Sequence, residues 1–160
     1  PVLGETLPPI ARLVIAHAGE MPARGAPWPL VGVASNGRYT TAKEKAELDA
    51  RQAGLGRPGA TCGVLIPIRK SAAWWVLTQD ARRAIFEEQS AHIRGSMKFL
   101  PAVARKLYHS RDLGEPFDFL TWFEFAPEAA GGFDELLGFL RGTVEWQYVE
   151  REVEVRVRRT

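Results

Sequence analysis

Apolar and polar positions follow a regular order from about residue 29 to the C-terminus, and this order predicts alternating strands and helices. The predicted strands are residues 29–35, 61–68, 117–125 and 148–158. The predicted helices are residues 41–52, 78–89, 97–108 and 133–141. This succession indicates an α+β, ferredoxin-like fold, in which helices pack on one face of an antiparallel or mixed sheet. The other face then needs a cover, which a ligand, a second subunit or both could supply.

Two local signals refine the helix boundaries. Thr40 or Thr41 is the expected N-cap of the first helix, because Glu44 follows three residues beyond Thr41 and completes a capping box. Pro101 falls inside the predicted helix 97–108, and a proline is tolerated only in the first turn of a helix. The regular part of that helix is therefore expected to begin near Pro101.

The length of 160 residues suits one domain. Residues 1–28 are rich in proline, glycine and alanine and are expected to form a partly irregular N-terminal extension, followed by a single domain over residues 29–160. The single cysteine excludes an internal disulfide and a multi-cysteine metal site. A secretory signal is not visible, so a cytoplasmic location is expected, or a periplasmic one if a leader has been removed.

The charge pattern gives little support for a nucleic-acid or membrane partner. The net charge is only +2, and the basic residues near the C-terminus alternate with valines, as on a strand with one solvated face. No apolar run approaches the roughly 20 residues that span a bilayer. We therefore expect neither nucleic acid nor membrane as a partner.

The three histidines, His17, His92 and His109, are far apart in sequence, which disfavours a three-ligand zinc site. Ser110 and Asp112 lie beside His109, but adjacent residues seldom form a working hydrolase triad, and no GxSxG elbow is present. Haem remains possible because the porphyrin supplies four ligands and the protein needs only one axial residue.

His92 follows the helix 78–89 and would share a face with Ile85 and Gln89 if that helix continued. The position suits either a core histidine or an axial ligand, and a lone histidine is more often a structural residue. A ligand histidine needs an acceptor for its second ring nitrogen, and Glu145 is a candidate that spacing alone cannot place there.

Other residues could hold the anionic groups of a cofactor or a substrate. Lys70 and Trp74 follow the apolar segment 61–68 and are either core residues with a solvated lysine or donors to haem propionates, a role that Tyr39 could share. Arg105 lies among apolar residues and is either a structural ion-pair partner or an anion clamp.

Four segments resemble the chlorite dismutases, specifically their short, dimeric branch. These segments are residues 69–75 (RKSAAWW), the pair His92 and Arg105 with twelve residues between them, residues 107–124 (LYHSRDLGEPFDFLTWFE) and residues 140–152 (LRGTVEWQYVERE). The likeness runs from about Leu30 to the C-terminus, and its central segment is highly specific.

The resemblance implies a haem b enzyme that decomposes chlorite to chloride and dioxygen. It implies that His92 is the proximal iron ligand, that Glu145 accepts a hydrogen bond from the other imidazole nitrogen, and that Lys70 lies nearby. It also implies that Arg105 is a mobile distal residue that retains the hypochlorite-level intermediate. The propionate-binding positions of the family fall on Tyr39 and Trp74. The implied assembly is a homodimer of the dimeric α+β-barrel type, with haem on the sheet face opposite the helices.

Two departures and three alternatives accompany this resemblance. The chain is too short for the additional N-terminal lobe of longer members, and it lacks their extra tryptophans downstream of Trp75; both features fit the short branch. The alternatives are a relative that resembles the coproheme decarboxylases or peroxidases, a non-enzymatic haem carrier or sensor, and a small dimer without a cofactor. Arg105 favours chlorite chemistry over coproheme decarboxylation, since many decarboxylases have no distal arginine.

Overall fold

The computed structural model describes residues 2–17, 20, 25–35 and 38–159. Its strands are β1 (Val33–Ala34), β2 (Cys62–Lys70), β3 (Ala104–His109), β4 (Phe119–Phe125), β5 (Val149–Glu152) and β6 (Val155–Arg158). Its α-helices are α1 (Ala42–Arg51), α2 (Ala72–Trp75), α3 (Gln79–Arg83), α4 (His92–Ser96) and α5 (Ala130–Arg141). A π-helix spans Ala84–Gln89, and 3₁₀ turns span Met97–Phe99, Arg111–Leu113, Pro127–Ala129 and Glu145–Tyr148.

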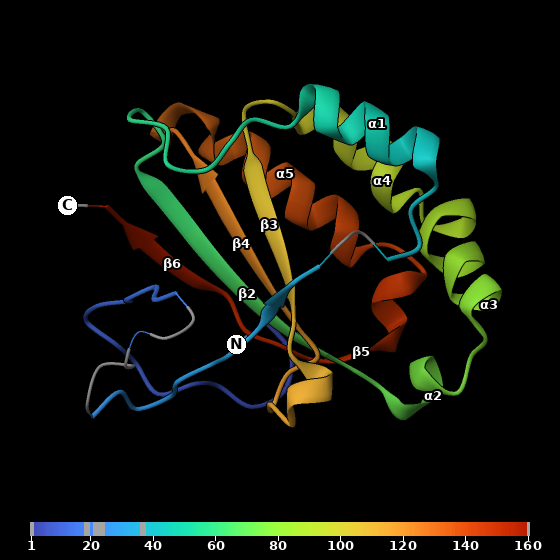
Figure 1. Cartoon of the computed structure of the whole chain (residues 1–160), viewed down its shortest axis with the longest axis horizontal. Coiled ribbons are helices and arrows are strands. Elements are labelled where there is room, and N and C mark those ends of the chain that lie inside the picture. The colour runs from blue at the N-terminus through green and yellow to red at the C-terminus, as the bar shows by residue number, and fades with distance from the viewer. Residues whose placement is uncertain (1, 18–19, 21–24, 36–37, 160) are drawn as a thin grey trace.

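The strands form one antiparallel sheet in the order β1-β3-β4-β2-β5, and β6 pairs with the first half of β2. The helices α3, α4 and α5 lie on one side of this sheet (Figure 1). The predicted α+β class with an antiparallel sheet is therefore confirmed.

The core lies between the sheet and α5. Apolar residues of α5 recur at the three- and four-residue spacing of one helix face, and they pack against alternate residues of β2 and β4. The α5 members are Phe133, Leu136, Leu137 and Leu140, and the strand members include Val64, Ile66, Ile68, Phe123 and Phe125. Phe133 is fully buried and stacks on Phe125 at 4.5 Å between ring centroids.

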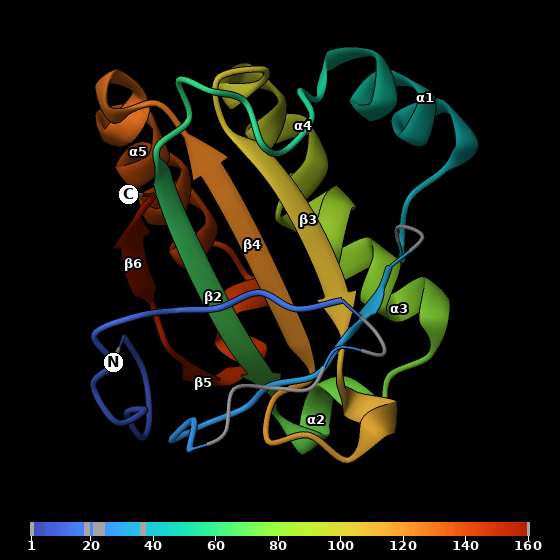
Figure 2. The same ribbon diagram turned by 60° about the vertical axis from the view of Figure 1, so that its left-hand side comes forward.

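The other face of the sheet is partly covered by the N-terminal segment, which runs across it (Figure 2). Leu7 and Leu30 pack against a cluster that includes Phe117, Leu120 and Val153. Residues 2 and 3 hydrogen bond to the carbonyl of Glu152. The chain thus supplies part of the cover itself, which the apolar pattern did not predict.

The strongest local signals were correct and one helix was wrong. Thr41 and Glu44 form the expected capping box at α1. The predicted helix 97–108 ends after a single 3₁₀ turn, and Ala104–His109 is strand β3. Pro101 stops the helix, and pairing with β4 satisfies the backbone groups of the residues that follow.

An ion pair fixes α1 to the helical segment that begins with α3. The Glu44 carboxylate accepts hydrogen bonds from both terminal nitrogens of Arg83, at 2.7 and 2.5 Å. These bonds, above all, lower the pKa of Glu44 from 4.5 to about 2. The carboxylate is therefore more stable as an anion in the folded chain than in the unfolded chain.

Because the pKa of Glu44 is lower in the folded state, its contribution to stability is complete above about pH 4.5 and disappears as the pH falls towards 2. Glu44→Gln keeps a side chain that can complete the capping box, so it isolates the charge. We expect this variant to lose about 1 kcal/mol of unfolding free energy at pH 7 and almost nothing near pH 2.5. Urea unfolding at several pH values measures this difference, with exposed Glu47→Gln as the control. An equal loss at both pH values would contradict the assignment.

Candidate functional site

A cavity of about 120 Å³ lies between the sheet and the helices and opens to solvent. Its walls are mostly apolar side chains of β2, β3, β4, α4 and α5, which suits a large planar organic group. The expected position of haem, on the sheet face away from the helices, is not where this cavity lies. Residues on the helix-facing side of β2, β3 and β4 form one wall of the cavity, and residues of α4 and α5 form another.

Three predicted site residues meet at the helical wall of the cavity. His92 Nδ1 lies 2.6 Å from Glu145 Oε2, and Lys70 Nζ donates to Glu145 Oε1 at 2.7 Å. Glu145 and Lys70 are buried, whereas the His92 side chain is 17% exposed. The network joins the end of β2, the start of α4 and the turn after α5. The sequence named Glu145 only as a candidate, and the structure places it in contact with His92.

The Glu145 carboxylate is held as an anion. Burial alone would raise its pKa, but the charges and hydrogen bonds of His92 and Lys70 outweigh burial and lower the pKa from 4.5 to about 2. An ionised acceptor fixes the Nδ1 proton of His92, and this leaves Nε2 as the ring nitrogen that is able to bind a metal. Nε2 has no hydrogen-bond partner within the described part of the chain.

His92 does not continue the preceding helix, so the face that it would have shared with Ile85 and Gln89 on a continued helix does not form. The chain passes from the π-helix through Ala91, whose φ of 50° lies in the left-handed region, and α4 starts at His92. Phe86 stacks on the imidazole at 4.2 Å between centroids. The change of direction turns the imidazole toward the cavity and Glu145. π-helical insertions of this kind are frequent at functional sites.

Two tryptophans flank Lys70. Its ammonium group lies 4.6 Å from the ring centroid of Trp74 and 5.7 Å from that of Trp146. Trp74 is buried, and its indole N–H has no hydrogen-bond partner, although a buried donor normally has one. Trp74 also lines the cavity, so an acceptor within the cavity would satisfy it.

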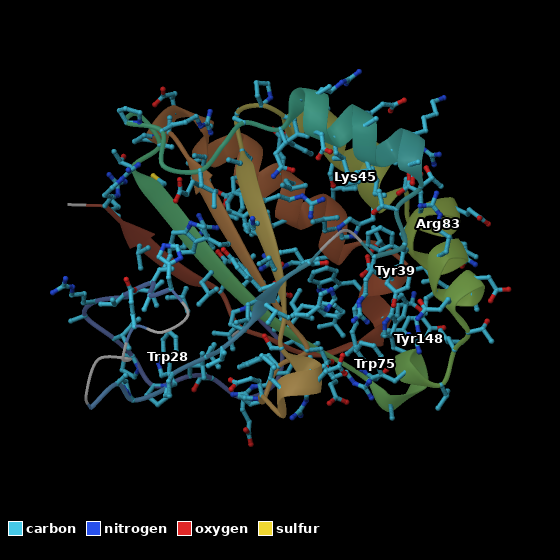
Figure 3. The ribbon with its side chains drawn as sticks, viewed as in Figure 1. Trp28, Tyr39, Lys45, Trp75, Arg83 and Tyr148 are labelled. Atoms are coloured by element: carbon cyan, nitrogen blue, oxygen red, sulfur yellow. The ribbon has the colours of Figure 1, made fainter. Side chains whose placement is uncertain are left out.

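Tyr39 packs edge-on against Trp74 at 5.9 Å, beside the helical segment from α2 to α3 (Figure 3). Its hydroxyl accepts a 3.5 Å hydrogen bond from Arg82. Tyr39 adopts a φ of 61°, which is uncommon for a residue with a large side chain. The structure therefore brings Tyr39 and Trp74 together at one end of the cavity.

Arg105 lines the same cavity from the opposite layer, because β3 belongs to the sheet. The predicted helix around Arg105 was wrong, and strand register now decides its direction: Arg105 pairs with Phe123, and both line the cavity. The guanidinium makes no ion pair or hydrogen bond with any described residue. Burial lowers the pKa of Arg105, yet a guanidinium remains charged at neutral pH. The arrangement leaves a cation free to bind a small anion.

Several residues that shape the site were not predicted from the sequence. Thr121 and Leu107 line the cavity beside Arg105, and alternation along β3 and β4 would have identified them once β3 was read as a strand. Glu87 and Ser90 hold the backbone around His92 and Glu145. Nothing in the spacing of the sequence predicts the contacts of these two polar residues.

The described residues contain no group of three or more His, Cys, Asp or Glu side chains that could hold a metal ion. The hydroxyl of Ser110 is buried without a hydrogen bond, and His109 bonds to Ser35 instead. None of the helices in the described ranges has the length and hydropathy needed to cross a bilayer.

Known proteins resemble this chain over most of its length. A family model described as chlorite dismutase matches residues 19–159. The curated chlorite dismutase of Ideonella dechloratans is 32% identical over 121 residues, which are 74% of this chain and 40% of that protein. The chain thus spans about two fifths of this curated relative.

Solved structures of chlorite dismutases also resemble this chain. A dimeric chlorite dismutase from Nitrobacter winogradskyi shares 59% sequence identity with a TM-score of 0.93, over 99% of this chain and 90% of that one. The chlorite dismutase of Candidatus Nitrospira defluvii in complex with imidazole shares 33% identity with a TM-score of 0.64, over 77% of this chain and 49% of that one.

Removing Lys70 tests whether the buried network holds the site together. In Lys70→Met the Glu145 carboxylate keeps only His92 as a charged partner, and breaking a buried ion pair costs about 3 kcal/mol. Arg69→Met is a matched control, because Arg69 forms an exposed pair with Glu150 whose loss costs less than about 1 kcal/mol. Urea unfolding of both haem-free variants measures the difference. Equal losses of unfolding free energy in the two variants would show that the buried pair contributes no more to stability than the exposed pair.

Proposed function

The chain belongs to the chlorite dismutase family, and from this premise we propose that it is a haem b enzyme that decomposes chlorite to chloride and dioxygen. One observation carries the proposal: His92, backed by Glu145 at 2.6 Å, and the unpaired guanidinium of Arg105 line one cavity from opposite layers. A redox site of this kind needs a ligand for iron on one side and a cation for the substrate anion on the other.

The residues of the cavity fit a haem. His92 Nε2 would bind the haem iron, and the indole N–H of Trp74, which has no partner in the chain, would donate to a propionate, with Tyr39 beside it. When bound, haem supplies the redox-active iron for breaking Cl–O bonds and forming the O–O bond. The protein supplies orientation, charge and a confined, mostly apolar space.

Glu145 and Lys70 act through His92. A carboxylate that accepts the Nδ1 proton increases the electron donation of the imidazole and favours higher oxidation states of its metal. Lys70 keeps this carboxylate ionised and in place, with its ammonium 2.7 Å from Oε1. The proton thus stays on Nδ1, and Nε2 remains available to the cavity.

Arg105 binds the anionic substrate and the anionic fragment formed from it. A guanidinium stays charged and offers several donors, so it can orient chlorite on entry and retain the hypochlorite-level fragment until the O–O bond forms. The absence of a partner for Arg105 among the described residues supports this role, since a structural arginine would be paired. Retention protects the protein, because an escaped hypochlorite would oxidise it.

We also propose that the chain acts as a homodimer. The supporting comparison is the dimeric protein from Nitrobacter winogradskyi, of which this chain covers 90%. Size-exclusion chromatography with light scattering tests this assembly.

The direct test of the proposed function is to add chlorite to the haem-loaded protein at an oxygen electrode. Dioxygen and chloride released in a one-to-one ratio are the expected result. Turnover of coproheme with peroxide and none of chlorite would identify a decarboxylase-like relative instead. Reversible haem binding without either activity would identify a carrier or sensor.

Replacing His92 tests whether this residue binds the haem iron. His92→Ala is expected to weaken haem binding by at least about 100-fold, because outer-shell partners alone contribute about 10- to 100-fold to the affinity for a metal. His109→Ala is the control, since His109 does not line the cavity. Haem titration followed by absorbance measures both. Tight, spectrally normal haem in His92→Ala would rule out the assignment.

Replacing Arg105 tests retention. Arg105→Ala should still bind haem but should bleach earlier, with total turnovers before inactivation reduced on the order of tenfold by loss of one charged contact. Lys106→Ala changes the exposed neighbour on the same strand and serves as control. Unchanged total turnovers in Arg105→Ala would count against the role.

A further inference from the structure

Glu87 is a buried carboxylate that neither the resemblance nor the proposed chemistry uses. It is 5% exposed, and it forms no ion pair within the described part of the chain. Oε2 accepts the backbone N–H of Ile93 at 2.6 Å, and Oε1 accepts that of Arg94 at 3.1 Å. Burying an unpaired carboxylate is costly, so its position requires an explanation beyond packing.

The two N–H groups belong to the residues that directly follow His92, in the first turn of α4. That helix has only five residues and would not be stable by itself. Ala91, just before it, is in the left-handed region, where a residue with a Cβ pays about 1–2 kcal/mol. The backbone turn that orients His92 therefore needs stabilising contacts from outside α4. Glu87 provides them through two charge-assisted hydrogen bonds.

The same turn also holds the partner of His92. Ser90 Oγ accepts the backbone N–H of Glu145 at 2.9 Å. Residues 87–91 thus hold both ends of the 2.6 Å bond between His92 and Glu145, Glu87 on the imidazole side and Ser90 on the carboxylate side.

We infer that Glu87 is a positioning residue that sets the place of the His92 imidazole relative to Glu145. This inference rests on the proposed function in so far as His92 is taken as the iron ligand. Loss of the Glu87 contacts lets the first turn of α4 shift, which lengthens the hydrogen bond to Glu145 and weakens the electron donation of the imidazole. The geometry of that bond is a property of the protein whether or not haem is bound.

The test compares Glu87→Ala and Glu87→Gln with Glu88→Gln, an adjacent exposed carboxylate. Haem should dissociate about tenfold faster from Glu87→Ala. The iron–histidine stretching band of the ferrous protein should move to lower frequency in that variant. Glu87→Gln keeps one acceptor oxygen and should fall between Glu87→Ala and the unchanged protein, and Glu88→Gln should match the unchanged protein. If Glu87→Ala does not fold, the contrast between the two glutamine variants decides.

A readout without haem separates this inference from the proposed function. The downfield ¹H NMR signal of the His92 Nδ1 proton in the haem-free protein reports the bond to Glu145 directly. A shifted or broadened signal in Glu87→Gln supports positioning even if the unchanged protein binds no haem, an outcome that would overturn only the proposed function. An unchanged NMR signal, or unchanged haem dissociation and band frequency with only a lower melting temperature, would show a merely structural role and overturn the inference.

Discussion

The buried carboxylate of Glu145, shared between His92 and Lys70, is the interaction on which the rest of the site depends. An ionised carboxylate away from water is tolerated only when cations and donors surround it, because its desolvation costs several kcal/mol. The sheet contributes Lys70, α4 contributes His92, and the turn after α5 contributes the acid. The network therefore exists only when the sheet and the helical layer have packed, and site formation is part of folding.

The two walls of the cavity have opposite physical character. On the helical side, several polar groups around His92 Nδ1 are hydrogen bonded: Glu145 contacts His92, Lys70 and Ser90, and Glu87 accepts two backbone N–H groups at the start of α4. On the sheet side, Arg105 projects from a rigid strand with an unpaired guanidinium. In the proposed function, His92 would be the fixed ligand of the haem iron and Arg105 the free cation that meets the anions.

The sheet has two unlike faces, and the chain uses them differently. The helix-facing side carries the core and the cavity. The outer side is crossed by the N-terminal segment, which packs Leu7 and Leu30 onto it. The chain corresponds to about half of the longer Candidatus Nitrospira defluvii protein and to nearly all of the dimeric Nitrobacter winogradskyi protein. The described residues of one sheet and its helical layer line the cavity.

Where local chemistry was decisive, the sequence by itself determined the structure: the capping box of α1, the apolar strand β2, and the three- and four-residue apolar spacing of α5. The resemblance named the candidate site residues, whose roles remain a proposal. Only the tertiary structure decided that residues 104–109 are a strand, because their alternation is ambiguous until β4 supplies partners for the backbone. It alone decided that Glu145 meets His92, 53 residues away, since contact between distant segments follows from packing and not from spacing.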